Sequence, residues 1–225
     1  MRHLCSFKQF LATGRLGPIS TDLDMRQVAD RLGTPQDWLF SRYDEPPYWI
    51  YSEIDNDRPK LEISFSLDTP HPVEWFQIED ANYICEDFHL FGQSLAMTSD
   101  GLSGASTPSE YLRSGALDAE KTTIYLDEYF ELAIVTDRIV AFFYRQDGAG
   151  DDMSDDGKRV IFDGFGKGLD FREHDGVYRI DSIESHPEGG TAWRWSDRLL
   201  TRATCSIPQY LAMMDGTPDS VAPQT

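Results

Sequence analysis

The sequence predicts an α+β fold in which an antiparallel sheet carries a few short helices packed on one face. Some segments space their apolar residues three or four apart and are bounded by capping residues, which is typical of helices. Others alternate apolar and polar residues between short links rich in Asp, Gly and Pro, which is typical of strands. With 225 residues, 40% of them hydrophobic and 12% aromatic, the chain can bury a core of this kind.

The first hundred residues predict two helices followed by three strands. Residues 3–13 form a short amphipathic pattern that ends at Gly14. Residues 24–32 form a second one, which Gly33 ends and Pro35 keeps from restarting. The three strands are expected at residues 48–52, 60–67 and 73–79.

The pattern then recurs. Thr107, Pro108 and Glu110 have the spacing of an N-cap, a first-turn proline and a capping-box acid. Three strands are expected after this helix, at residues 121–126, 129–135 and 138–144, with a tight hairpin between the last two. We interpret the recurrence as an internal duplication, with a unit in residues 1–100 and a second unit in residues 101–215 packed against it.

The last third of the chain predicts further strands and one helix. Residues 146–157 are rich in Asp and Gly and are expected to form a mobile loop, whereas residues 216–225 have no apolar period and are expected to be a disordered tail. The elements expected between them are strands at 159–162, 169–172 and 177–183, a strand or helix at 193–201 and a helix at 207–214.

Charge is the outstanding property of the composition. Twenty Lys and Arg against thirty-nine Asp and Glu give a net charge of −19. Nucleic acids and anionic membranes attract clustered cations, so we expect neither as a partner. A basic protein partner fits the sign, because complementary charge speeds encounter. The alternative is that the negative surface only keeps the protein soluble.

The N-terminal segment has no apolar stretch of signal-peptide length, and no run approaches the length of a membrane helix. We therefore expect a cytoplasmic protein. The three cysteines, Cys5, Cys85 and Cys205, are widely spaced and form no C-x-x-C pair, which favours reduced thiols.

The sequence contains no metal-binding, phosphate-binding or catalytic motif with the required residue spacing. An EF-hand loop started at Asp151 would need an oxygen ligand where Met153 stands, and one started at Asp147 would need it at Ala149. Residues 164–168 contain G-F-G-K-G, which lacks the spacing of a phosphate-binding loop. H-E-x-x-H and G-x-S-x-G are absent as well. We expect no metal, no cofactor and no enzymatic activity.

Two groups of residues are candidates for contact with a partner protein. Trp193 and Trp195 would share one face of a strand, where they would either pack in the core or anchor an interface. The other group is the acidic loop, which would otherwise be a solvated surface loop; its carboxylates are Asp147, Asp151, Asp152, Asp155 and Asp156.

A family resemblance covers about a third of the chain. Residues 14–18 read G-R-L-G-P and residues 28–38 read V-A-D-R-L-G-T-P-Q-D-W. This resembles the start of bacterial toxin-immunity proteins, in which G-x-L-G-P precedes V-x-x-x-L-G-x-P-x-x-W and strands follow. The helix with its L-G-x-P end is also similar to the repeat of the β-lactamase inhibitory protein and of a small outer-membrane assembly lipoprotein. The resemblance implies helices on an antiparallel sheet and assigns no functional residue.

These observations lead to one main hypothesis and two alternatives. The main hypothesis is an immunity or inhibitor protein that binds and neutralises a cognate, basic antibacterial toxin. The first alternative is a carboxylate-dependent hydrolase, which would need a deep pocket holding Asp or Glu side chains with raised pKa values. The second alternative is a structural or adaptor domain.

Overall fold

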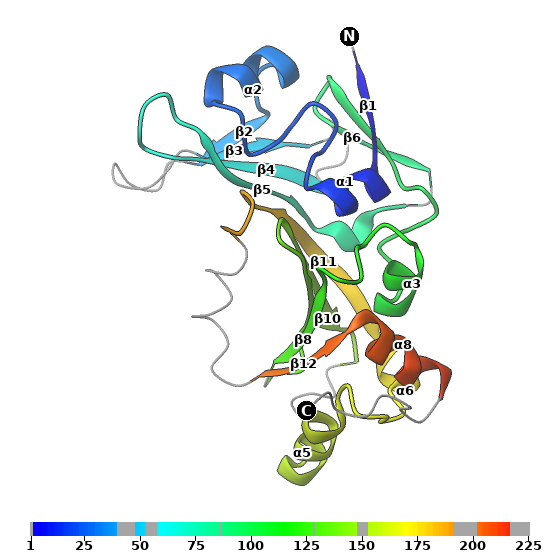
Figure 1. The fold of residues 1–225 in the computed structure, drawn as a ribbon. Helices are drawn as coiled ribbons and strands as arrows, with labels where there is room; N and C mark the ends of the chain where they lie inside the picture. The colour runs from blue at the N-terminus through cyan, green and yellow to red at the C-terminus, as the bar shows by residue number, and fades with distance from the viewer. Residues whose placement is uncertain are drawn as a thin grey trace.

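The computed structural model describes residues 2–39, 48–52, 58–85, 87–127, 129–147, 153–190 and 202–216. The fold is α+β, with a large antiparallel sheet and a few short helices, as the sequence predicts (Figure 1). In chain order, the elements are β1 (His3–Ser6), α1 (Phe7–Thr13), α2 (Met25–Leu32), β2 (Asp37–Leu39), β3 (Tyr48–Tyr51), β4 (Lys60–Phe65), β5 (Val73–Glu79), η1 (Ala81–Tyr83), β6 (Phe88–Phe91), β7 (Leu95–Thr98), α3 (Pro108–Arg113), β8 (Thr123–Asp127), β9 (Leu132–Val135), β10 (Ile139–Arg145), α5 (Asp155–Gly164), α6 (Arg172–Asp175), β11 (Tyr178–Ser185), β12 (Arg202–Ser206) and α8 (Ile207–Asp215).

Both halves of the chain contribute to one nine-stranded sheet, in the order β12-β8-β9-β10-β11-β5-β4-β3-β2. Strands β2 to β5 form one antiparallel meander, and β8 to β11 form another. The meanders meet through their last strands, because β11 pairs antiparallel with β5 and places Ile183 opposite Ile78. Each meander therefore has four strands rather than the three that the repeat pattern predicts. The duplication itself stays a prediction.

A second, three-stranded sheet has the order β1-β7-β6. Its strand β1 corrects the prediction of a helix over residues 3–13, because the first four of these residues pair in parallel with β7, His3 opposite Leu95. The helix begins only at Phe7, after Ser6 accepts a hydrogen bond from the Gln9 backbone as N-cap. Helical spacing put Leu4 on the apolar face, yet 72% of its surface is exposed.

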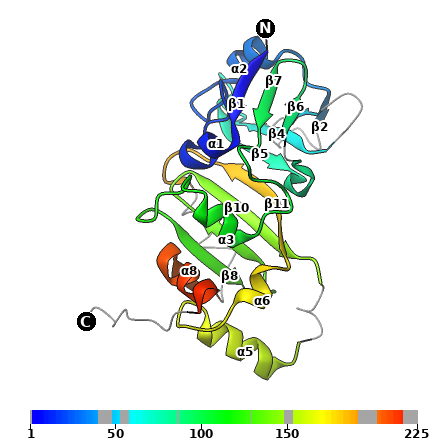
Figure 2. The same ribbon diagram turned by 90° about the vertical axis from the view of Figure 1, so that its right-hand side faces the viewer.

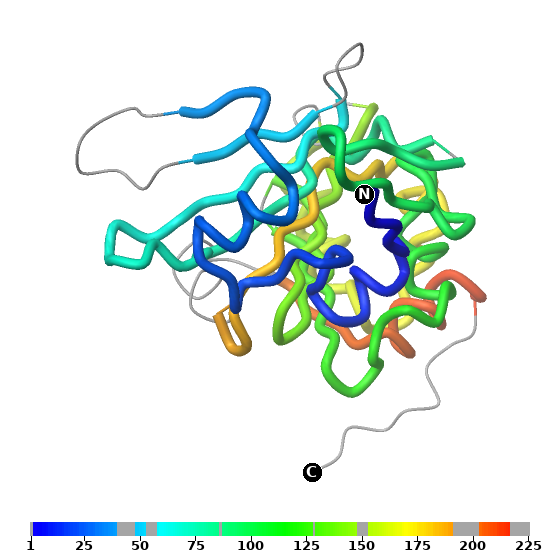
Figure 3. Tube along the Cα trace, turned by 90° about the horizontal axis from the view of Figure 1, so that it is seen from above, coloured from blue at the N-terminus to red at the C-terminus, as the bar shows by residue number. Residues whose placement is uncertain are grey.

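One hydrophobic core runs through both halves of the molecule. Helices α3, α6 and α8 cover the second meander on the same side of the sheet as α1 covers the first (Figures 1 and 2). Aromatic rings join them: the Phe7 ring of α1 meets Tyr111 of α3 edge-on at 6.0 Å, and Tyr111 meets Phe143 of β10 at 5.3 Å. Seen from above, α2 and the first meander project to one side (Figure 3).

Several predicted boundaries are confirmed by their caps. Helix α2 has a complete capping box between Asp24 and Gln27, and α3 has one between Thr107 and Glu110. The expected hairpin between β9 and β10 is present, with the Thr136 amide bonded to the Ile139 carbonyl. The predicted strands 48–52, 60–67, 73–79, 121–126, 129–135, 138–144 and 177–183 and the helix 207–214 agree with observed elements within a few residues.

Two expected strands are wrong. Residues 159–162 lie inside α5, which Ser154 caps and whose first turn is residues 155–157, so the expected loop over 146–157 ends earlier than predicted. Residues 169–172 lead into α6 instead of forming a strand. The apolar run at 160–162 has β-branched residues typical of strands, but Val160 is 62% exposed and only Ile161 is buried. This is the pattern of a surface helix with one inward side.

The two ends of the described chain are built alike. Residues 5–12 read C-S-F-K-Q-F-L-A and residues 205–212 read C-S-I-P-Q-Y-L-A. In each case a strand ends at a serine N-cap, a helix follows, and a left-handed glycine ends it, Gly14 in α1 and Gly216 in α8. This likeness lies outside the predicted helix-plus-three-strand pattern. The disordered tail was expected at residues 216–225; Gly216 caps α8, and residues 217–225 lie outside the described residues.

Candidate functional site

The predicted acidic loop is only partly within the described residues. Asp147 follows β10 and accepts two hydrogen bonds from Arg145, at 3.0 Å from Nε and 2.6 Å from Nη2. Asp155 and Asp156 stand exposed in the first turn of α5, where carboxylates favour the helix N-terminus. Each thus has a local structural role. Asp151, Asp152, Trp193 and Trp195 lie outside the described residues.

The structure brings together a different set of carboxylates, on the sheet face turned away from the main core. Their side chains alternate along β4 and β5 with buried residues, so they point to the opposite side. Glu62 of β4 lies opposite Gln77 of β5, which lies opposite Glu184 of β11. We call this surface the acidic face and define it by Tyr48, Glu62, Trp75, Gln77, Glu79 and Glu184.

Hydrogen bonds fix the carboxylates of the acidic face. The Gln77 amide donates to Glu62 Oε2 at 2.7 Å and to Glu79 Oε2 at 2.8 Å. The Tyr48 hydroxyl also donates to Glu62, and its ring meets Trp75 at 5.4 Å. Two carboxylates are therefore held beside each other on a rigid sheet, next to two aromatic rings.

Holding these charges together is electrostatically unfavourable. Burial, followed by repulsion from Glu62, Asp181 and Asp80, raises the pKa of Glu79 from 4.5 to about 7. Among the groups that act on Glu79 in this way, only Lys60 lowers its pKa. The pKa of Asp181 is also raised, chiefly by burial. A cation placed on the acidic face would relieve the repulsion.

The same face continues over the second meander as a small apolar cluster. Ala133, Val135 and Val140 form it, with Tyr125 and Phe142 packed alongside. Between the two regions, Glu184 is held by His186, whose Nε2 lies 2.7 Å from Glu184 Oε2. The face thus passes from acidic to apolar across β11.

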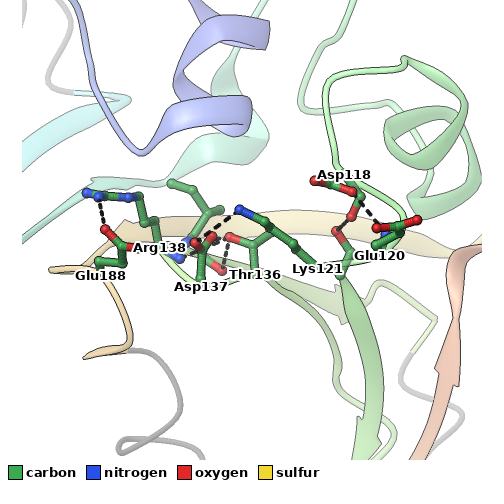
Figure 4. Close-up of polar contacts among 9 residues, drawn as sticks. Asp118, Glu120, Lys121, Thr136, Asp137, Arg138 and Glu188 are labelled. Carbon is green, nitrogen blue, oxygen red and sulfur yellow. Dashed lines mark hydrogen bonds and ion pairs between the residues drawn. The ribbon is translucent and has the colours of Figure 1, made fainter.

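A second group of charged residues lies where α1 meets the β9–β10 turn (Figure 4). It surrounds a pocket of about 360 Å³. Its three cations are all engaged, in the pairs Arg15–Asp22 at 3.2 Å, Lys121–Asp137 at 3.9 Å and Arg138–Glu188 at 2.6 Å. Exposed pairs of this kind contribute little stability, and with their charges already balanced they offer no strong site for an anion.

A third feature is an apolar pocket of about 560 Å³ beside β2. Trp38 of β2 and Trp49 of β3, which lie opposite each other in the sheet, line it together with Met25 of α2, Leu67 and His71. Trp38 is the tryptophan that ends the V-x-x-x-L-G-x-P-x-x-W pattern. Glu79, Glu131 and Asp181, whose pKa values are raised, line neither this pocket nor the pocket of about 360 Å³ beside α1.

No family model, curated protein or solved structure matches the chain. Among the described residues, no group of three or more His, Cys, Asp or Glu side chains is placed to hold a metal ion. The same part of the chain contains no helix that is long and apolar enough to cross a bilayer.

Sequence reasoning placed Glu62 and Gln77 on strands but did not assign them to a site. The alternation in β4 and β5 showed that these residues face away from the core. It did not show that β5 pairs with β11, which lies about a hundred residues further along the chain. That pairing brings Glu184 beside Gln77, whereas Glu62, Gln77 and Glu79 come together within the β4–β5 pair alone.

Proposed function

We propose that this protein is an immunity or inhibitor protein, which binds a basic toxin domain through the acidic face. The observation that carries the proposal is the pair Glu62 and Glu79, held side by side by Gln77 against mutual repulsion. A protein that keeps carboxylates together in this way binds a cationic surface more strongly, because part of the electrostatic cost is already present before binding.

The aromatic residues of the acidic face support a protein partner over a simple ion. Tyr48 and Trp75 pack against each other beside Glu62 and are partly exposed. Tyrosine and tryptophan are enriched at the energetic centres of interfaces, because they bury a large area at a small cost in conformational entropy. A rigid strand scaffold adds to this by keeping the face in one shape.

The test is a pull-down of the tagged protein, co-expressed with the product of the neighbouring reading frame. We expect a salt-sensitive complex that also protects cells from that product. Glu62→Gln combined with Glu79→Gln is expected to weaken it strongly. The matched control removes two other charges, Asp155→Asn with Asp156→Asn, and is expected to leave the complex intact.

The outcomes separate the candidate surfaces. Loss of the complex in the control but not in the Glu62 and Glu79 variant would move the contact to the start of α5. A complex that both double variants leave intact, or no complex at any salt concentration, would contradict the proposal.

The hydrolase alternative has one observation in its favour. A carboxyl group with a pKa near neutrality, such as that of Glu79, is suited to general acid catalysis. However, Glu79 lies on a sheet face rather than in either of the two pockets described above. Hydrolysis that disappears in Glu79→Gln, with no partner protein, would favour this alternative.

A further inference from the structure

An open apolar pocket lies between the start of helix α2 and the first meander. Its volume is about 560 Å³, which is typical of pockets that bind small molecules. Its apolar walls are Met25 of α2, Trp38 of β2, Trp49 of β3 and Leu67 of the link between β4 and β5. The Trp49 ring is held in place by Phe65, which it meets edge-on at 4.8 Å. The two tryptophans are cross-strand neighbours, so their rings lie side by side on one face of the sheet.

Backbone hydrogen bonds keep the walls of this pocket in place. The Met25 amide donates to the His71 carbonyl oxygen at 3.0 Å, which ties the start of α2 to the link between β4 and β5. The Gln36 amide donates to the Ile50 carbonyl oxygen at 3.0 Å, which ties the link after α2 to β3. Closing the pocket would break these bonds, whereas leaving its apolar walls in contact with water is unfavourable. Both costs are avoided when an apolar ligand fills the pocket.

One residue that lines the pocket carries an oriented acceptor. His71 Nδ1 lies 2.9 Å from the Ser66 carbonyl oxygen, which can only accept, so Nδ1 of the neutral ring carries the hydrogen. Nε2 is then an acceptor, and no described residue bonds to it. A ligand that covered Nε2 without donating a hydrogen bond would leave a buried acceptor unsatisfied, which is unfavourable. The pocket therefore favours a ligand with one N–H or O–H group.

The pocket favours a ligand without charge. None of the described residues that line it is Lys, Arg, Asp or Glu. Moving a charged ligand from water into such a site is unfavourable, because no opposite charge replaces its hydration. The net charge of the protein, −19, repels anions in addition.

We propose that this pocket binds a neutral, planar aromatic small molecule of about two or three fused rings, which donates one N–H or O–H hydrogen bond to His71 Nε2. The rings of the ligand pack on the indoles of Trp38 and Trp49, in the offset or edge-on arrangements that aromatic pairs prefer. Met25 and Leu67 supply aliphatic walls. The site lies apart from the acidic face, and this inference does not rest on the proposed function.

The test measures the binding of three naphthalene probes to the full-length protein by equilibrium dialysis at neutral pH. Naphthol has two fused rings and one O–H donor, methoxynaphthalene has the same rings and no donor, and naphthoate carries a negative charge. We expect naphthol to bind about threefold to tenfold more tightly than methoxynaphthalene, and naphthoate to bind most weakly. Non-specific apolar binding would give the reverse order for the first two probes, because methoxynaphthalene is the more apolar of them.

Protein variants locate the binding. His71→Gly removes the acceptor at a position with φ 63°, which glycine adopts readily, and is expected to abolish the preference for naphthol over methoxynaphthalene. Trp38→Ala is expected to weaken the binding of both probes by about tenfold. The controls are Tyr129→Ala, which removes another exposed ring, and Glu62→Gln combined with Glu79→Gln; both are expected to bind naphthol like the wild type. Circular dichroism checks that each variant is folded.

Equal or reversed binding of naphthol and methoxynaphthalene by the wild type would overturn the proposal. So would a His71→Gly protein that keeps the preference, or a Trp38→Ala protein that binds naphthol like the wild type. No binding of naphthol, together with a toxin complex that Trp38→Ala weakens, would overturn it in favour of a partner side chain in the pocket. Naphthol binding with the expected dependences but no toxin complex would support this site and reject the immunity proposal.

Discussion

Replacing Glu79 by glutamine tests whether the folded protein disfavours the charged form of Glu79, as burial and the neighbouring carboxylates indicate. The change removes the ionisable group but leaves an oxygen that can accept the hydrogen bond from Gln77. Burial and repulsion from Glu62 and Asp181 raise the pKa of Glu79 from 4.5 to about 7. The folded wild type therefore binds a proton more tightly than the unfolded chain.

The sign of the effect follows from that difference. The contribution of Glu79 to stability is fully present below about pH 4.5 and is lost as the pH rises through about 7. A rise in the pKa of Glu79 from 4.5 to about 7 corresponds to about 3.4 kcal/mol in the free energy of unfolding if solvent screening is ignored. Because the side chain is only partly buried, water screens the repulsion, and we expect about 1–2 kcal/mol.

The assay is urea unfolding followed by tryptophan fluorescence, at several pH values between 5 and 8. Glu79→Gln is expected to be more stable than the wild type by about 1–2 kcal/mol at pH 8, with the advantage shrinking towards pH 5. Glu74→Gln is the matched control, since Glu74 is an exposed carboxylate on the same strand. It is expected to change stability by less than about 0.5 kcal/mol at every pH. A Glu79→Gln advantage that does not change with pH, or a loss of stability at pH 8, would refute the reasoning.

Three further predictions concern the core and its thiols. The buried Asp175 carboxylate accepts hydrogen bonds from the Ser109 amide, the Ser109 hydroxyl and the Tyr210 hydroxyl, at 2.8–3.0 Å. Asp175→Ala is therefore expected to lower the free energy of unfolding by about 3 kcal/mol, and Tyr210→Phe by about 1 kcal/mol. Gly104→Ala is expected to lower the free energy of unfolding, measured in urea, by more than about 2 kcal/mol, because its Cβ would lie 2.0 Å from the Asn82 carbonyl oxygen. Gly176→Ala is the control and is expected to be nearly neutral, since its Cβ would meet nothing within 3.7 Å. Mass spectrometry after alkylation of the native protein should show one labelled thiol, the exposed Cys85, and three labelled thiols after denaturation. Cys5 and Cys205 are buried, and burial raises the pKa of both thiols, so their rapid labelling in the native protein would contradict the structure.

The local pattern was sufficient for β3, β4 and β5 of the first meander and for most helices, but it did not predict β2. Strand β4 alternates Leu61 and Ile63 with Glu62, and the capping boxes at Asp24 and Thr107 mark where α2 and α3 begin. These signals are local, because side-chain alternation and capping depend on residues a few positions apart. They were enough to predict the α+β class and an antiparallel sheet.

Elements whose formation depends on distant partners were missed or wrong. Strand β1 is four residues long and exists because it pairs with β7, about ninety residues away, and Cys5 Sγ donates to the Ala96 carbonyl oxygen across that pairing. The sequence of β1 continues smoothly into a helical period, so propensity alone extended the helix. In α5 the opposite occurred, because an apolar run with strand preference became a surface helix after the Ser154 cap.

The sequence by itself determined the class of this protein, its negative charge and the positions of most of its regular elements, because these follow from composition and from interactions between near neighbours along the chain. Only the tertiary structure decided that β5 and β11 pair and unite the two halves into one sheet, that β2 becomes an edge strand, and that Glu184 joins Glu62 and Glu79 on one face. The physical reason is that strand pairing is a contact between segments far apart in sequence, and the periodicity of a strand says which way its side chains point but not which strand lies beside it.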